Sequence, residues 1–285
     1  NGDHRDLHLS LRRQRQMCIR DRFLCLILLS GPAFTQLEEF PRTPDGKPDL
    51  SGVWQAMTNA HYDIEPHAAA YGPYPREFGA FSAIPADLGI IEDGRIPYNE
   101  QSLRQRDANR VDAITKDPLA DCYMPGVPRA NYLPFPFQIV QSRDVVLIAY
   151  EFAEANRILY VDQPDLTSQV DAWMGHSTAH WEGDTLVVRV SGQMPDTWFD
   201  RAGNHHSFQM VVEERWTPAS PNHINYTATI TDPNTFTRPW TISFPLYRHI
   251  REDMQLLEFK CAEFAEEYTY GEWRKPGTPI GNPQQ

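Results

Sequence analysis

A series of short segments in residues 136–262, whose side chains alternate between apolar and polar, constrains the fold most strongly. The alternation is clearest in residues 224–231 (Ile-Asn-Tyr-Thr-Ala-Thr-Ile-Thr) and residues 240–246 (Trp-Thr-Ile-Ser-Phe-Pro-Leu). A period of two is typical of a β-strand that has one buried face and one solvated face. This part of the chain is therefore expected to form an antiparallel sheet.

Further segments have the composition of strands and complete the predicted sheet. They are residues 145–152, 157–161, 178–181, 185–190, 208–216 and 256–261. The connections between them are short and no helical pattern separates them, which argues against a parallel α/β sheet. The sequence predicts an all-β domain over residues 136–275, an up-and-down meander closed into a barrel, with a sandwich as the alternative.

Proline interrupts residues 37–135 so often that long regular elements are excluded from this half. One strand is expected at residues 52–57. One short helix is expected from about residue 100 to residue 114, with Asn99 or Ser102 as its N-cap. The remainder of residues 37–135 is expected to wrap the barrel as an irregular, Pro-rich arm.

The first 36 residues differ from the rest of the chain. Residues 1–22 contain six arginines and no apolar period, and residues 17–22 match the translation of a sequencing adapter. We expect residues 1–22 to be disordered adapter translation; the alternative is the basic region of a signal peptide. Residues 23–29 are an apolar run as long as a signal-peptide core and too short to cross a bilayer.

Residues 23–36 are therefore interpreted as the remains of a signal peptide, which predicts a periplasmic or secreted protein. Cys18 lies in the expected adapter translation and Cys25 in the apolar run of the signal peptide, which leaves Cys122 and Cys261. In an oxidising compartment these two cysteines are predicted to form a disulfide that ties the arm to the last strand. The alternative is two separate buried thiols. Residues 276–285 are expected to form a tail.

The net charge of the chain limits the classes of partner that it can bind. With 26 Lys and Arg against 38 Asp and Glu, the formal net charge is −12. Binding to nucleic acid or to an anionic membrane needs clustered cations, so neither is expected. No segment after the leader is apolar for long enough to insert into a membrane. No phosphate-binding loop or dinucleotide fingerprint is present, and no cofactor is expected.

Two motifs carry a resemblance to known proteins. Residues 46–54 (GKPDLSGVW) and residues 181–188 (WEGDTLVV) resemble a large family of exported bacterial proteins. Further matching segments are residues 122–129, 137–141, 232–241 and 258–261. The resemblance covers residues 40–274 and implies export, but it implies no activity. Phe208 departs from the pattern, because an acidic residue often follows the His-Ser pair in that family; this puts a His–carboxylate role there in doubt.

The triplet Gly52-Val53-Trp54 resembles the start of lipocalin-type calycin barrels. In those barrels the tryptophan closes one end, and the other end opens onto a ligand cavity. The resemblance therefore implies a calycin-like barrel. The alternative is that Trp54 is an ordinary core aromatic.

The connection formed by residues 193–207 is the strongest candidate for a functional loop. It is longer than an ordinary hairpin loop and contains carboxylates, histidines and aromatic rings. We predict that His206, Asp200 and Glu214 are catalytic acid–base groups. Strand alternation places Glu214 inside the barrel near Trp216, where a carboxylate needs a partner. The alternative to a catalytic role is a structural ion pair with Arg129, Arg157 or Arg238.

Ligand-binding roles are predicted for His176, Trp198, His205 and Tyr132, around one concave pocket shared with the acid–base groups. The alternative is that Trp198 anchors the loop to the sheet. No metal site is predicted, because His176 and His180 lie four residues apart on a strand, about 13 Å, too far to share one ion.

Two small-molecule functions remain open at this stage, beside a structural role in the cell envelope. The first is an exported barrel that binds a small apolar or aromatic molecule in its interior. The alternative is a hydrolase, lyase or isomerase that uses His, Asp and Glu on the same scaffold. In both cases the partner is a small-molecule ligand or substrate, and the sequence implies no oligomeric state.

Overall fold

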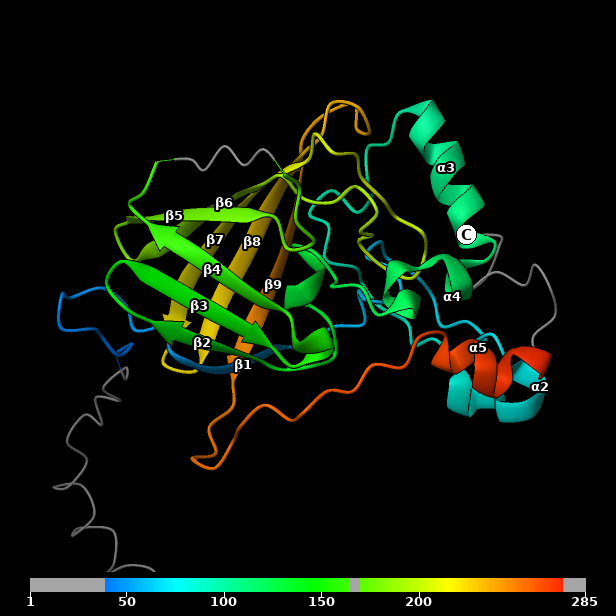
Figure 1. The fold of residues 1–285 in the computed structure, drawn as a ribbon, viewed down its shortest axis with the longest axis horizontal. Coiled ribbons are helices and arrows are strands. Elements are labelled where there is room, and N and C mark those ends of the chain that lie inside the picture. The colour runs from blue at the N-terminus through cyan, green and yellow to red at the C-terminus, as the bar shows by residue number, and fades with distance from the viewer. Residues whose placement is uncertain (1–38, 165–169, 274–285) are drawn as a thin grey trace, which may run out of the picture. The chain divides into compact units, whose positions relative to one another are not determined.

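A closed β-barrel is the centre of the computed structural model, which describes residues 39–164 and 170–273. Within those residues the barrel contains β1 (Gly52–Ala56), β2 (Phe137–Gln141), β3 (Val145–Tyr150), β4 (Asn156–Val161), β5 (His176–Glu182), β6 (Thr185–Ser191), β7 (Val211–Ser220), β8 (His223–Thr231) and β9 (Trp240–Arg248). Strands adjacent in sequence pair with one another, and β1 pairs with β9 to close the barrel (Figure 1). The predicted all-β barrel is confirmed, and the sandwich alternative is wrong. The expected adapter, signal peptide and tail lie outside the described residues.

One strand pair departs from the expected antiparallel meander. β4 and β5 are parallel, with Leu159 opposite Ser177, while every other neighbouring pair in the barrel is antiparallel. A parallel pair needs a connection that returns the chain to the same end of the sheet. The barrel is therefore mixed rather than purely antiparallel.

Two boundaries of the predicted barrel also differ. β1 belongs to the barrel rather than to a surrounding arm, so the barrel is not confined to residues 136–275. Residues 256–261, expected to be a strand, are extended coil. The physical reason is that β9 already pairs with β8 on one side and with β1 on the other, which leaves no free edge.

More than one helix lies outside the barrel. The helices are α2 (Pro75–Phe78), α3 (Glu100–Arg110), α4 (Ala113–Lys116) and α5 (Ala265–Tyr270), with short 3-10 turns at Gly79–Ser82, Pro118–Asp121, Arg129–Asn131, Phe152–Glu154 and Gly271–Trp273. The predicted helix is confirmed as α3, but it ends early, because Asp112 leaves the helical conformation (φ −138°) and separates α3 from α4. The expectation of a single helix is wrong, since α2 and α5 also form. Asn99 caps α3 as predicted, and its side chain accepts a hydrogen bond from the Ser102 N–H at 2.9 Å. Among the described residues, no helix is long and apolar enough to cross a membrane.

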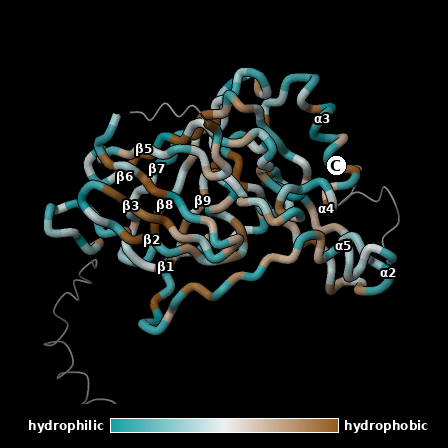
Figure 2. The backbone as a smooth tube through the Cα atoms, in the orientation of Figure 1, coloured by the Kyte–Doolittle hydropathy of each residue, from teal (hydrophilic) through white to brown (hydrophobic). Residues whose placement is uncertain are grey.

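Side chains fill the interior of the barrel. On β8, Ile224, Tyr226, Ala228 and Ile230 are all buried at alternate positions, as the period of two predicts. Figure 2 shows hydrophobic (brown) residues interspersed with hydrophilic ones along the barrel strands. Large aromatic rings complete the core, and the Trp216 and Tyr226 rings pack edge to face with centroids 5.0 Å apart.

Trp54 lies at the junction of the first and last strands. Its side chain is fully buried, and its indole N–H donates to the Leu50 carbonyl at 2.8 Å. Arg248 lies directly opposite on β9, with its guanidinium carbon 4.3 Å from the indole centroid. This cation–π contact adds to the hydrogen bonds that close the barrel.

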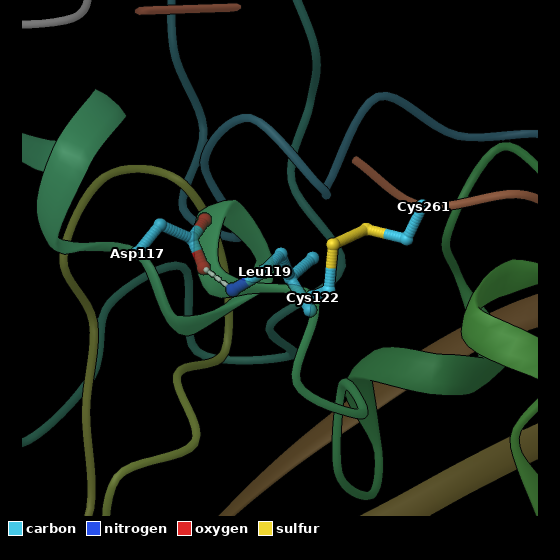
Figure 3. The surroundings of a disulfide bond; sticks show 4 residues. All are labelled: Asp117, Leu119, Cys122 and Cys261. Atoms are coloured by element: carbon cyan, nitrogen blue, oxygen red, sulfur yellow. Dashed lines mark hydrogen bonds between the residues drawn. A yellow bond between two sulfur atoms is a disulfide. The ribbon is translucent and has the colours of Figure 1, made fainter. Parts of the chain in front are cut away.

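A disulfide joins Cys122 to Cys261, with the two Cα atoms 5.8 Å apart (Figure 3). The predicted pairing is confirmed. The disulfide does not tie the arm to the last strand as expected, because Cys261 lies in coil after β9 rather than on a strand. The C-terminal segment leaves the barrel, runs beside it and ends in α5, next to α2 (Figure 1), where the Phe78 and Tyr270 rings meet edge to face at 5.1 Å.

Removing this disulfide is expected to destabilise the protein strongly. The bond closes a loop with a sequence separation of 139 residues. In the chain-entropy model, a loop of this length lowers the entropy of the unfolded state by an amount equivalent to about 5 kcal/mol. Urea denaturation of the oxidised parent and of the Cys122→Ser/Cys261→Ser variant measures the difference. A loss below about 1 kcal/mol would contradict a role in holding the C-terminal segment.

Candidate functional site

The short segment from α4 to Cys122 forms a partition between two surface cavities. Asp117 caps the turn Pro118–Asp121 by accepting a hydrogen bond from the Leu119 N–H at 3.1 Å, as Figure 3 shows. Pro118 occupies the first position of this turn, where its missing N–H costs nothing. Cys122 ends the turn in the left-handed conformation, with φ 61°.

A buried ion pair holds this partition against the rest of the protein. The Arg129 guanidinium donates to both carboxylate oxygens of Asp117, at 2.8 and 2.6 Å, and both side chains are buried. Bidentate pairs of this kind fix orientation as well as distance. The Arg129 Nε has no partner among the described residues. Asp117 and Arg129 both line the first of the two cavities.

The first cavity has a volume of about 380 Å³. Its walls are mainly apolar and come from α4, the partition, the segment before β2 and the C-terminal segment after Cys261; they include Ile114, Leu119, Phe135, Phe152 and Phe264. The polar wall residues are His61, Asp117, Arg129, Arg201, Glu266 and Glu267. Mainly apolar walls with a few polar groups are typical of a small-molecule site.

A smaller chamber of about 230 Å³ adjoins the first cavity. The two spaces share Tyr62, Arg201 and Glu266, and the chamber adds an aromatic wall that includes Tyr74 and Tyr270. Arg201 donates to Glu266 at 2.7 Å. This ion pair therefore lies where the first cavity and the side chamber meet.

His61 is a partly buried titratable group on the wall of the first cavity. Burial, together with the positive charges of Arg201 and Arg129, lowers the pKa of His61 to about 4. Its Nδ1 atom has no hydrogen-bond partner among the described residues. The imidazole is therefore neutral at pH 7 and retains hydrogen-bonding capacity.

A second cavity, of about 570 Å³, lies on the other side of the partition. Trp198 and His205, both predicted ligand-binding residues, line this second cavity. The loop that carries them is held against α3, because Gly203 (φ 86°) approaches the helix so closely that a Cβ would lie 2.8 Å from the Asn109 Cβ. The His205 ring stacks on Tyr98 with centroids 5.5 Å apart.

Asp200, a predicted catalytic residue, is fully buried next to this loop. Its carboxylate accepts hydrogen bonds from the Ile64 N–H at 2.8 Å, the Ala202 N–H at 2.9 Å and the Asn204 side chain at 2.6 Å. Burial and the neighbouring Asp63 carboxylate raise the pKa of Asp200 to about 7. Through these hydrogen bonds the carboxylate holds Ala202 and Asn204 in the turn that follows it.

His206, the second predicted catalytic residue, is also buried. Its Nε2 atom lies 2.7 Å from the Thr197 hydroxyl, and its Nδ1 atom lies 2.9 Å from the Ser207 carbonyl oxygen. Both ring nitrogens therefore have partners within the loop. Burial lowers the pKa of His206 below its ordinary value.

Glu214 lies inside the barrel, as the alternation of β7 predicts. It forms an ion pair with Arg157 and accepts hydrogen bonds from Asn131 at 2.9 Å and from the Tyr226 hydroxyl at 2.8 Å. Tyr132 is buried as well, and its hydroxyl donates to the Phe199 carbonyl at 2.7 Å.

His176 lies on β5, where its Nε2 atom is 2.9 Å from the Val170 carbonyl oxygen. The expected pocket shared by His176, Asp200, His205, His206 and Glu214 is not formed. Asp200 and Glu214 have no accessible surface, so neither can line a space that admits a ligand. Of the predicted residues, the second cavity brings together Trp198 and His205.

No protein-family model, curated protein or solved structure matches the chain. Across residues 39–164 and 170–273, no group of three or more His, Cys, Asp or Glu side chains is arranged to hold a metal ion. The first cavity was not predicted, because His61, Tyr62 and Arg129 lie in the irregular arm, where no periodic pattern marks which side chains converge.

His61 should make stability depend on pH in a defined window. Its folded-state pKa is about 4 against an ordinary value of 6.5, so between these values the unfolded chain binds a proton more readily. The stabilising effect is present above pH 6.5 and is lost as the pH falls toward 4, by about 3 kcal/mol. Urea denaturation at pH 7.5 and pH 4.5 should show that His61→Gln loses less stability than the parent.

The matched control for this experiment is His180→Gln, which changes an exposed histidine of β5. It separates the burial of His61 from the effect of removing any imidazole. Equal losses of stability in the parent and in His61→Gln would contradict a buried neutral His61.

Proposed function

We propose that this chain is an exported protein that binds a small apolar or aromatic molecule in the first cavity and its side chamber. The proposal rests on the observation that the first cavity and the side chamber adjoin each other and share part of their lining. The volume of about 380 Å³ for the first cavity lies in the range of small-molecule sites. Their shared lining combines an aromatic ring with a charged pair.

The walls favour a ligand with an aromatic or apolar body. Phe135, Phe152 and Phe264 face the first cavity, and Tyr74 and Tyr270 face the side chamber. Aromatic walls gain dispersion energy and prefer offset or edge-to-face contacts with another ring. Burying such a ligand removes apolar surface from water on both sides of the contact.

Arg201 favours an acidic group on that ligand. One of its N–H groups donates to Glu266, and a guanidinium offers five N–H groups in a fork that matches a carboxylate. The Arg201 side chain is 28% exposed, so a ligand can reach it. An anionic group placed between the cavity and the chamber would pair with Arg201.

Two observations favour this site over the barrel interior expected from the sequence. Trp54, Phe137, Trp216 and Tyr226 fill the interior with aromatic rings. The interior carboxylate of Glu214 is already paired within the chain. We therefore propose the ligand site outside the barrel.

The state of the predicted acid–base groups favours binding over catalysis. Asp200, His206 and Glu214 are buried, and each has its polar atoms engaged by groups of the chain. A catalytic acid or base must lie within hydrogen-bond reach of its substrate. Export is supported by the disulfide, since such bonds persist in oxidising compartments.

Filling the first cavity should abolish binding of a probe that fits it. The probe is 8-anilino-1-naphthalenesulfonate, which combines aromatic rings with an anionic group. We expect saturable one-site fluorescence enhancement with the parent. Ala265→Trp, which puts a large ring on a wall residue of the first cavity, should weaken binding at least about tenfold, equivalent to about 1.4 kcal/mol.

The control is Ala219→Trp, which adds the same ring at an exposed position of β7. Its affinity for the probe should equal that of the parent. A parent that does not bind, or an Ala265→Trp variant that binds as well as the parent, would reject the proposed site.

A further inference from the structure

The second cavity differs in chemistry from the first. Tyr123 and Trp173 form a stacked pair on its wall, with ring centroids 4.3 Å apart and planes inclined by 11°. Tyr123 is 45% exposed, so the pair is accessible. A third ring, Trp198, is packed with Ile84 and Ile114 and presents a firmly held indole to the same cavity.

Polar groups stand beside these rings. Asp121 and Asp196 line the second cavity, and in the part of the chain that the structure describes neither carboxylate has a hydrogen-bond or ion-pair partner. Lys116 and Gln105 lie on the same wall. The Nδ1 atom of His205 is likewise without a partner among the described residues.

We propose that the second cavity binds a saccharide. The electron-rich face of an aromatic ring attracts polarised C–H groups, which a pyranose ring presents on its flat faces. Sugar hydroxyls are donors and acceptors at once, so they can donate to Asp121 and Asp196 and accept from Lys116. A saccharide therefore matches the rings, the carboxylates and the ammonium group together.

Other ligand classes match the second cavity less well. An apolar molecule would remove Asp121 and Asp196 from water and give them no partner, which is costly. An organic cation would suit the carboxylates and the rings, but it offers no acceptor for the Lys116 ammonium group. This site is independent of the first cavity, from which the Pro118–Asp121 turn separates it.

The test uses cellohexaose, xylohexaose and laminarihexaose as probes in isothermal titration with the oxidised full chain. At least one should bind. Tyr123→Ala and Asp196→Asn should each weaken that binding about tenfold or more. Tyr160→Ala removes a tyrosine of similar exposure (38% against 45%) from β4 and serves as the matched control, and Ala265→Trp alters the first cavity only. Both controls should bind the saccharide as the parent does.

Three results would overturn the proposal. The first is that none of the three hexasaccharides binds to the parent. The second is that a saccharide binds but neither Tyr123→Ala nor Asp196→Asn changes its affinity. The third is that benzyltrimethylammonium binds in the second cavity and the saccharides do not, which would assign the cavity to organic cations.

Discussion

The disulfide between Cys122 and Cys261 holds together two segments that are 139 residues apart in sequence. Residues close to Cys122 line both cavities. Leu119, just before Cys122, lines the first cavity, and Tyr123, just after it, lines the second. Phe264 follows Cys261 into the wall of the first cavity, and its N–H donates to the Ala120 carbonyl at 2.7 Å. One covalent bond thus positions walls that no continuous strand or helix connects.

The barrel carries this arrangement, and its interior is filled by side chains of the chain itself. Its interior tolerates the charges of Arg157 and Glu214 because each is paired and hydrogen-bonded; an unpaired charge there would be strongly destabilising. Ser177 accepts a hydrogen bond from Arg157 at 3.1 Å, across the parallel β4–β5 pair. Polar side chains inside the barrel therefore stabilise its packing.

The strands could be predicted because a period of two follows directly from side-chain alternation; β8 and the interior position of Glu214 are examples. The parallel β4–β5 pair could not, since alternation does not reveal strand direction. Trp198 and His205 were found because their loop is long. Arg157, one of three arginines expected as possible partners of Glu214, is the one that pairs with it. The partner of Asp200 could not be predicted, because Ile64 lies far away in sequence and donates through its backbone N–H.

The most direct test of a ligand site beside the disulfide is a crystal structure of the oxidised protein soaked with 4-iodobenzoate, located by the anomalous scattering of iodine. The structure predicts an iodine peak in the first cavity or its side chamber, with the carboxylate paired to Arg201. A peak inside the barrel, or no bound probe beside Arg201 and Phe264, would contradict the proposed ligand site.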